Sequence, residues 1–253
     1  MKKILFSLFV VGCSLLFLPS CTLYSDAEVA PNNNGKSGSI TKFTVVENYL
    51  YALSDNKIVV YDISDKNNMI NVGSTTVAYN IETIFSFTNR LYIGATDGVF
   101  IVDITDKTKP VVQSKAMHFV GCDPAIAKAN VAYSTVRTGT VCNNNFRSNG
   151  MLVVYDVTDA LYPRELTFIV MEEPQGLSYD GNTLFVCNGN YGVHVYDITD
   201  NRNPEYLTKI SDINAVDVIA ENNLLIVSSP SGYTFCDYTD LNNIRIVKTI
   251  NKN

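Results

Sequence analysis

One short phrase recurs five times along this chain and constrains the fold more than any other feature. Each copy contains an aspartate, an aliphatic or aromatic residue, a serine or threonine, and a second aspartate. The copies occupy residues 62–65, 103–106, 156–159, 197–200 and 237–240, so their first aspartates are 41, 53, 41 and 40 residues apart. A period near forty residues is typical of β-propellers, in which each repeat forms one four-stranded blade. The sequence therefore predicts an all-β fold, a five-bladed β-propeller with four antiparallel strands per blade.

The second repeat shows how each blade is expected to form. Short apolar runs at residues 81–87, 91–94, 98–103 and 111–114 predict four strands. Asn89, Asp97 and Gly98 supply turn residues between them. The same order of strands and turns can be followed in the fourth repeat, which supports one blade per copy of the phrase.

The repeated aspartates have a structural explanation. Short Asp, Ser and Thr side chains accept hydrogen bonds from backbone N–H groups in turns. A proline follows the second aspartate by four residues in three copies, at Pro110, Pro163 and Pro204, and fixes the backbone before the next strand. The alternative is one calcium site per blade, but calcium needs six to eight oxygen ligands and the sequence has no dense run of carboxylates. We expect turn caps, with no metal and no cofactor.

The repeated phrase also carries a family resemblance. Residues 99–110, together with the other copies, resemble the LVIVD-repeat proteins, a group of bacterial and archaeal cell-surface or secreted β-propellers. The resemblance extends over about residues 40–250. Met69 and Ile244 stand where the family usually has proline, so the terminal blades depart from its pattern. The resemblance implies a surface-displayed propeller and brings no assigned enzyme activity.

The first residues predict an export signal. Lys2 and Lys3 precede an apolar run at residues 4–18, which is shorter than the ~20 residues of a spanning helix. The following Leu18-Pro19-Ser20-Cys21 resembles a bacterial lipoprotein signal, in which the cysteine is lipidated and becomes the mature N-terminus. Cys13 fits the same pattern with a shorter apolar segment, and an ordinary cleaved signal is a further alternative. We predict a signal peptide at residues 1–20 and lipidation of Cys21.

The remaining chain is predicted to form a tether and one domain. Residues 21–39 are poor in apolar side chains and predict a flexible tether, whereas residues 40–253 predict the propeller. The formal net charge is −6 and no cluster of Lys and Arg is present, which argues against nucleic acid as a partner. We expect a monomer that is lipid-anchored in the bacterial cell envelope, at the outer membrane, and either periplasmic or surface-exposed.

The third repeat is about twelve residues longer than the others. Its extra residues lie between the predicted second and third strands, within residues 135–150. Loops on a rigid scaffold are where binding residues concentrate, although an insertion can also be tolerated surface decoration. The candidate binding residues on this top face are Asp123, Arg137, Asn143, Asn144, Phe146 and Arg147.

Four cysteines remain beyond the export signal and its cysteine, which allows three pairings. An exported protein meets oxidising surroundings. Cys122 and Cys142 both lie in predicted loops on one face of the third blade, so we predict a disulfide between them. Cys187 is the rival partner for Cys142, and Cys236 occupies a strand position that suits a small buried side chain.

The sequence offers little for catalysis. His194 lies between Val193 and Val195 on a predicted strand, which favours packing on the sheet, while His118 could face the ligand side. We therefore predict a non-catalytic module that binds a polar ligand or an envelope protein through its top face and third-blade insertion. The alternative is a polysaccharide lyase or glycoside hydrolase that uses acidic residues at the channel mouth; the candidates are Glu82, Asp123, Glu172 and Glu173. A third possibility is a purely structural component of an envelope complex.

Overall fold

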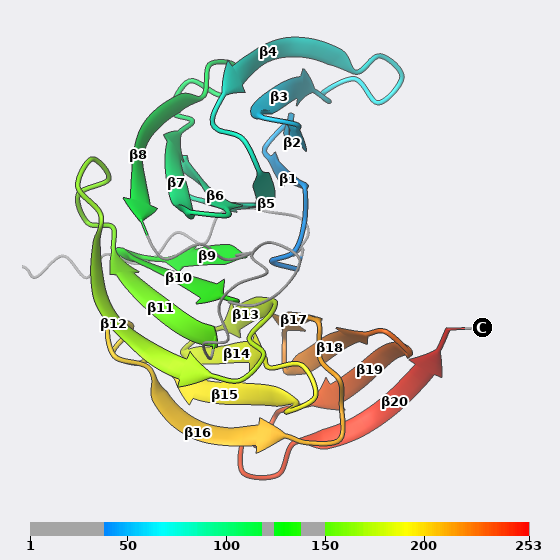
Figure 1. The fold of residues 1–253 in the computed structure, drawn as a ribbon. Helices are drawn as coiled ribbons and strands as arrows, with labels where there is room; N and C mark the ends of the chain where they lie inside the picture. Colours follow the sequence, from blue (N-terminus) through cyan, green and yellow to red (C-terminus); the bar gives the residue numbers. More distant parts are fainter. Residues whose placement is uncertain (1–37, 118–123, 138–149, 253) are drawn as a thin grey trace, which may run out of the picture. The chain divides into compact units, whose positions relative to one another are not determined.

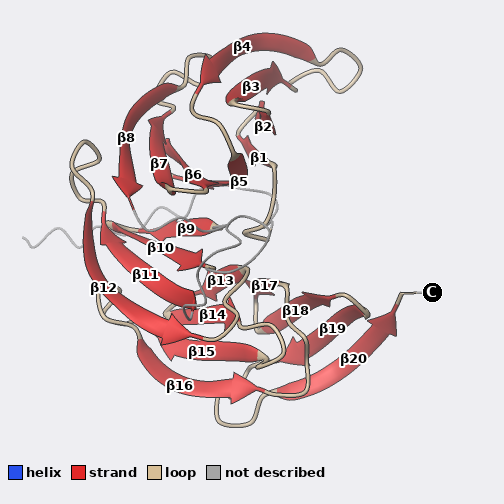
Figure 2. Cartoon of the chain, in the orientation of Figure 1, coloured by secondary structure: helices blue, strands red, loops and turns tan. Residues whose placement is uncertain are grey.

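The computed structural model describes residues 38–117, 124–137 and 150–252, all of which belong to one compact unit. These residues form twenty strands joined by turns and loops (Figure 2). Within the described ranges, no helix is long and apolar enough to cross a membrane. The predicted signal peptide, the lipidation site Cys21 and most of the tether lie outside the described residues.

The strands form five separate four-stranded antiparallel sheets (Figure 1). Sheet 1 contains β1 (Phe43–Val46), β2 (Tyr49–Ser54), β3 (Lys57–Asp62) and β4 (Ile70–Thr76), and sheet 2 contains β5 (Ile81–Phe87), β6 (Arg90–Ala95), β7 (Gly98–Asp103) and β8 (Val111–Met117). Sheet 3 contains β9 (Ala125–Lys128), β10 (Val131–Val136), β11 (Gly150–Asp156) and β12 (Arg164–Met171). Sheet 4 contains β13 (Leu177–Asp180), β14 (Thr183–Cys187), β15 (Val193–Asp197) and β16 (Glu205–Ile210), and sheet 5 contains β17 (Asp217–Glu221), β18 (Leu224–Ser229), β19 (Gly232–Asp237) and β20 (Arg245–Asn251).

Each sheet packs face to face on the next sheet in the chain. The first strand of each sheet contacts the first strand of the following sheet, from β1 against β5 through to β13 against β17. Four clusters of buried side chains, one at each junction, make up the core. Alternating apolar residues supply both faces of an inner sheet, because successive side chains on a strand point to opposite sides. The predicted propeller of five four-stranded blades is confirmed.

The predicted turn caps are also confirmed. In every copy of the repeated phrase, each of the two aspartates accepts a hydrogen bond from the backbone N–H two residues later, over 2.7–3.0 Å. The carbonyl of the second aspartate also accepts a bond from the N–H three residues on. These contacts satisfy backbone groups that would otherwise lack partners where the third strand ends.

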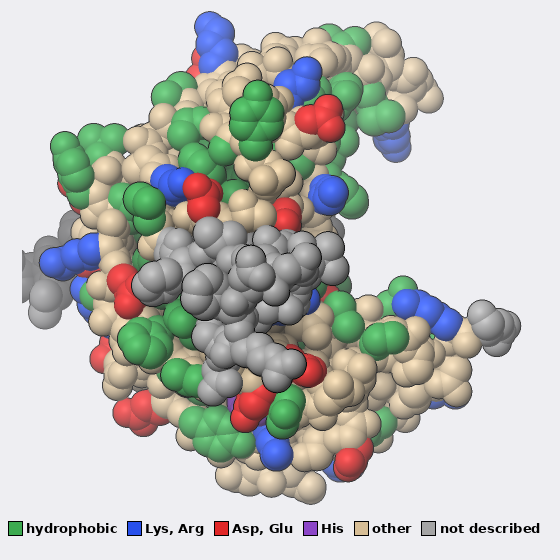
Figure 3. Space-filling view, in the orientation of Figure 1, with side chains coloured by type: hydrophobic (Ala, Val, Ile, Leu, Met, Phe, Trp, Pro, Cys, Tyr) green, Lys and Arg blue, Asp and Glu red, His purple; other side chains and the backbone are tan. Residues whose placement is uncertain are grey.

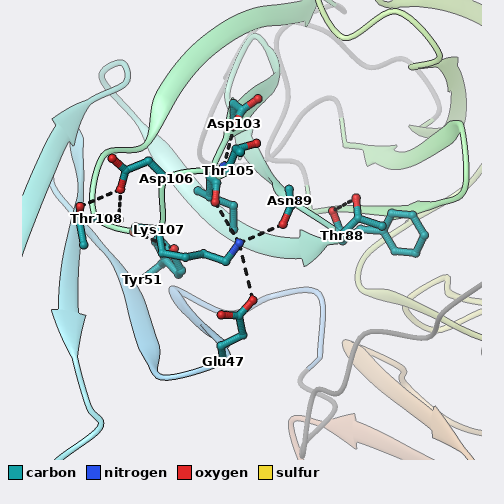
Figure 4. A network of polar contacts seen from close by, with 11 residues as sticks. Glu47, Tyr51, Thr88, Asn89, Asp103, Thr105, Asp106, Lys107 and Thr108 are labelled. Atoms are coloured by element: carbon teal, nitrogen blue, oxygen red, sulfur yellow. Dashed lines mark hydrogen bonds and ion pairs between the residues drawn. The ribbon is translucent and has the colours of Figure 1, made fainter.

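The same turns fasten neighbouring sheets to each other, a role that the sequence did not indicate. The hydroxyl of Tyr51 in sheet 1 donates to the backbone carbonyl of Lys107, directly after the repeated phrase of sheet 2 (2.9 Å). The Lys107 ammonium donates to the side-chain oxygen of Asn89 (2.9 Å) and lies 3.7 Å from the Glu47 carboxylate of sheet 1 (Figure 4). Tyr133 in sheet 3 makes the corresponding bond to Asn201 of sheet 4 (2.7 Å). The motif is therefore both a turn cap and part of the junction between sheets.

Candidate functional site

A pocket of about 420 Å³ opens where sheet 3 meets sheet 4. Strand β12 and the residue after it form one side, and strands β15 and β16 with the loop before β15 form the other. The lining residues are Ile169, Val170, Glu172, Tyr191, His194, Tyr196, Pro204, Tyr206 and Lys209. Four of these nine side chains carry aromatic rings and two carry opposite charges. We call this pocket the aromatic groove.

The aromatic rings of the groove are brought together by strand pairing. Val193 and Val195 of β15 point into the core between sheets 4 and 5, so His194 and Tyr196 point to the opposite side. Tyr206 pairs with Tyr196 across β15 and β16, and their ring centroids are 5.8 Å apart in an edge-to-face arrangement. The His194 and Tyr206 centroids are 5.7 Å apart. Tyr196 is buried at the base, whereas Tyr206 and Tyr191 are exposed.

A buried asparagine positions the polar side of the groove. The Asn188 amide nitrogen donates to the Glu172 carboxylate (2.6 Å) and lies 3.3 Å from Nε2 of His194. Its amide oxygen accepts a bond from the backbone N–H of Glu173 (2.8 Å), which fixes the orientation of the amide. The second amide hydrogen is then directed at Nε2 of His194, so this nitrogen is the acceptor and Nδ1 carries the proton.

The loop at residues 188–192 carries Tyr191 to the edge of the groove. The loop closes on itself, because Asn188 N–H donates to the Gly192 carbonyl (2.8 Å) and Tyr191 N–H donates to the Asn188 carbonyl (2.9 Å). The Glu173 carboxylate accepts bonds from the backbone and side chain of Asn190 (3.2 and 3.4 Å). Glu173 therefore supports this loop, and Glu172 is the carboxylate that faces the groove.

Burial determines the charge of the histidine in the groove. Partial burial lowers the pKa of His194 below its ordinary value, the nearby Lys209 ammonium lowers it further, and Glu172 opposes both effects. A histidine whose pKa lies below 6.5 is neutral at pH 7. The groove thus presents a neutral imidazole between one carboxylate and one ammonium group.

The candidate residues from the sequence fall largely outside the described ranges. Those outside are Asp123, Asn143, Asn144, Phe146 and Arg147, the lipidation site Cys21, the predicted disulfide partners Cys122 and Cys142, and His118. Arg137 is described, and its charge opposes the rise that burial causes in the pKa of Glu82, a candidate acid of the lyase or hydrolase alternative. Of the predicted binding residues only Arg137 lies within the described ranges, so that site stays a prediction.

The two described cysteines are free and buried. Cys236 is fully enclosed, as predicted for a small side chain, and burial raises its pKa to about 11. Burial likewise raises the pKa of Cys187, whose thiol lies in the core between sheets 4 and 5. Across the described part of the chain, no three His, Cys, Asp or Glu side chains gather as a metal site would require.

A protein-family model matches the first two copies of the repeated phrase and the residues around them. The model of the LVIVD repeat matches residues 36–77 and 89–117, which include sheet 1 and strands β6, β7 and β8 of sheet 2. The chain carries LVIVD repeats on a β-propeller. The matched segments contain the first two copies of the repeated phrase, at residues 62–65 and 103–106, with their turn caps. No curated protein matches the sequence significantly.

Solved structures resemble the LVIVD-repeat propeller in fold. The periplasmic gluconolactonase PpgL of Pseudomonas aeruginosa is 11% identical with a TM-score of 0.61, over 81% of this chain and 67% of that chain. BamB of Moraxella catarrhalis is 11% identical with a TM-score of 0.55, over 83% and 63%. The computationally designed Ika8 protein is 15% identical with a TM-score of 0.61, over 83% and 61%. The LVIVD-repeat propeller thus spans 61–67% of the length of these chains, and the likeness concerns the fold alone.

Sequence reasoning missed the aromatic groove. It placed His194 correctly on the sheet but assigned it only a packing role. The groove depends on Glu172 from the end of sheet 3 meeting strands β15 and β16 of sheet 4. The available signal was the pair His194 and Tyr196, two aromatic side chains at alternate positions opposite Tyr206 in the next strand.

Proposed function

We propose that this LVIVD-repeat propeller is a non-catalytic binding module, lipid-anchored in the bacterial cell envelope, and that the aromatic groove binds its ligand. The fold supports a binding or scaffold role, because propellers present loops and grooves on a rigid frame. The observation that carries the proposal is the cluster of His194, Tyr196 and Tyr206 beside Glu172 and Lys209 in one pocket. Ligand sites commonly combine aromatic walls with a few convergent polar groups.

The groove chemistry favours a ligand that contains a hydroxylated ring, such as the sugar of an envelope polysaccharide. Exposed tyrosine rings offer flat apolar surfaces with hydroxyl groups at their edges. Glu172 can accept hydrogen bonds from hydroxyl groups, whereas the Nδ1–H of the neutral His194 and the Lys209 ammonium can donate them. The opposite charges of Glu172 and Lys209 offset each other, which suits a ligand without a large net charge.

Glu172, at the groove, lies close in the chain to the strand ends that flank the third-blade insertion. Met171 pairs with Gly150, the first described residue after the third-blade insertion, and Glu172 follows Met171 directly. Arg137 ends the described segment on the other side of the insertion, one residue beyond Val136, which pairs with Met151. The insertion residues Asn143, Asn144, Phe146 and Arg147, with Asp123, are therefore proposed as further contacts for a ligand that extends beyond the groove.

The glycosidase alternative has less support from the described site. Hydrolysis of a glycosidic bond ordinarily uses two carboxyl groups on either side of the scissile bond. Among the described residues that line the groove, Glu172 carries the single carboxylate, and Glu173 is bonded to Asn190. A binding function requires no second carboxylate, so it fits the groove better.

Replacing Tyr206 by alanine is expected to weaken glycan binding by about tenfold or more, because an aromatic contact surface is lost. Binding would be surveyed on an array of bacterial polysaccharide fragments, and the best fragment would then be titrated by calorimetry. Tyr162→Ala is the matched control, since Tyr162 is exposed outside the groove. Equal losses in both variants, or release of reducing sugar from the bound fragment, would contradict the proposal.

Replacing Cys21 by alanine is expected to release the protein from membrane fractions, because acylation would be what holds an otherwise water-soluble domain there. Fractionation with metabolic labelling by a fatty acid would measure the effect, with Cys13→Ala as the control. Continued labelling of Cys21→Ala, together with loss of label in Cys13→Ala, would move the anchor to Cys13. Absence of label in the wild-type protein would reject lipidation.

A further inference from the structure

The first and last sheets each expose one apolar face. On sheet 1 this face carries Phe43 and Val45, which are 56% and 41% exposed, beside the partly exposed Leu50. On sheet 5 it carries Leu224 and Ile250, which are 42% and 49% exposed; the other apolar residues of that face are Ile219, Ile226, Tyr233 and Phe235. Exposed apolar faces of this extent commonly mark interaction surfaces.

The face exposed on sheet 1 is the one that the other sheets pack against the preceding sheet. Leu50 pairs with Tyr61, the residue before the first aspartate of the repeated phrase. The residues at that register in sheets 2, 4 and 5 are Leu91, Leu184 and Leu225, and each is fully buried. Leu91 belongs to the core that sheets 1 and 2 share. Leu50 is more exposed because no described sheet precedes it.

The face exposed on sheet 5 is the one that the other sheets pack against the following sheet. Ile226 occupies the register position of Tyr51, Tyr92, Tyr133 and Phe185, all of which are buried at a junction. No other described sheet is stacked on this side of β17–β20, and Figure 1 shows sheet 5 with sheet 4 on its opposite side. The described residues therefore form four filled junctions, and sheets 1 and 5 each carry one unmatched half of a junction.

We propose that these two faces meet between copies of this chain, sheet 5 of one copy packing against sheet 1 of the next. The two halves are complementary, because every junction within the chain joins the same pair of faces. Among the described strands, sheets 1 and 5 of one chain form no packed junction, although Ser39 before β1 donates to the Asp217 carboxylate of sheet 5 (3.3 Å). The described fold superposes on part of chains that are longer than this one.

The exposed face of sheet 5 differs from the internal junctions at one register position. The internal junctions add polar bonds such as that from Tyr51 to the carbonyl of Lys107, but Ile226 lacks a hydroxyl group at the equivalent position. The contact between copies would thus be more apolar at this point than the junctions that contain Tyr51 or Tyr133. Because the two faces differ, the association is head-to-tail and each copy contributes one face of each kind. This inference departs from the monomer that the sequence suggested and does not depend on the aromatic groove.

Co-capture of two tagged copies tests the proposal. Two full-length copies with different tags would be co-expressed and solubilised, one tag would be captured, and the other would be measured. The wild-type copies are expected to be captured together. When both copies carry Val45→Lys, or both carry Leu224→Lys, co-capture is expected to fall about tenfold or more, because a charge is forced into an apolar contact. Met117→Lys is the control, since Met117 is an exposed apolar residue on β8.

A mixed pair identifies the direction of the contact. A copy with Val45→Lys retains an intact sheet 5, and a copy with Leu224→Lys retains an intact sheet 1, so these two are expected to be captured together. Failure of the mixed pair, or survival of one of the like pairs, would overturn the head-to-tail contact. A monomeric wild-type protein would also overturn it, as would a disulfide within one chain of a variant that carries both Val45→Cys and Leu224→Cys. Thermal melting would confirm that each variant remains folded.

Discussion

Replacing Gly192 by alanine is expected to lower the free energy of unfolding by about 3 kcal/mol or more. Gly192 begins the return from the 188–192 loop into β15, with a φ of 89° that residues with a side chain rarely adopt. A Cβ atom here would also overlap the backbone carbonyl oxygen of Ile210 in β16. Backbone atoms paired in a sheet cannot move away as a flexible side chain could, so the strain remains in the folded state.

Gly181→Ala separates the two sources of that loss. Gly181 has a φ of 53°, but no heavy atom beyond its chain neighbours lies within 4 Å of an added Cβ. Alanine at this position should therefore cost only about 1 kcal/mol, from the backbone conformation alone. Urea denaturation followed by circular dichroism would measure both variants. Similar losses in the two variants would show that the overlap with Ile210 is relieved at little cost. Gly192→Ala should also weaken ligand binding, because it displaces Tyr191.

The fold could be predicted from the sequence because its information is local and repeated. The phrase that ends each third strand contains its own hydrogen-bonding partners, so Asp62 and Ser64 are already two residues apart in the chain. Contacts between sheets, in contrast, join residues that are far apart in the sequence. Tyr51 reaches Lys107 across 56 residues, and that pairing depends on how two sheets are registered against each other. A single sequence carries no direct signal for such a register.

The aromatic groove could not be predicted from the sequence for the same reason. His194 and Tyr206 are twelve residues apart, and they meet because β15 and β16 pair at a register that includes a β-bulge between Val195 and Tyr196. Glu172 joins them from sheet 3 through Asn188, whose burial could not be read from a loop rich in Asn and Gly. The sequence instead pointed to the most visible irregularity, the third-blade insertion.

In one copy of the repeated phrase, the carboxylate of the first aspartate, Asp156, makes hydrogen bonds in addition to the turn cap. Like the other first aspartates, Asp156 accepts the backbone N–H of the residue two positions later, here Thr158 (3.0 Å). Its other carboxylate oxygen also accepts bonds from Arg164 of β12 (3.0 Å) and from Arg202 in the repeat turn of sheet 4 (2.9 Å). The Asp156 side chain is 8% exposed, so this carboxylate joins two sheets at a site that is largely shielded from water.

Asp156→Ala is expected to lower the free energy of unfolding by about 2–3 kcal/mol, from the lost cap and the two arginines left without their shared partner. This loss is smaller than the loss expected for a fully buried ion pair, because both arginine side chains are partly exposed to solvent. Asp62→Ala is the matched control, since Asp62 makes the same turn bond to Ser64 and, among the described residues, no hydrogen bond or ion pair with an arginine. The free energy of unfolding lost in Asp62→Ala should be clearly smaller than that lost in Asp156→Ala. Equal losses would show that the arginines contribute nothing to the junction.

The pH dependence of the Asp156→Ala effect provides an independent check. Hydrogen bonds from Thr158, and then from Arg202, hold the pKa of Asp156 well below its ordinary value. The unfolded state therefore binds the proton first as the pH falls. The stabilisation by Asp156 is fully present above the ordinary aspartate pKa of about 3.9 and is lost as the pH falls through the lower folded value. The stability difference between wild type and Asp156→Ala should thus stay constant from pH 7 to about pH 5 and shrink below about pH 4. Denaturant titrations at each pH would measure it, and a difference that stayed unchanged down to pH 2 would mean that the carboxylate charge does not hold sheets 3 and 4 together.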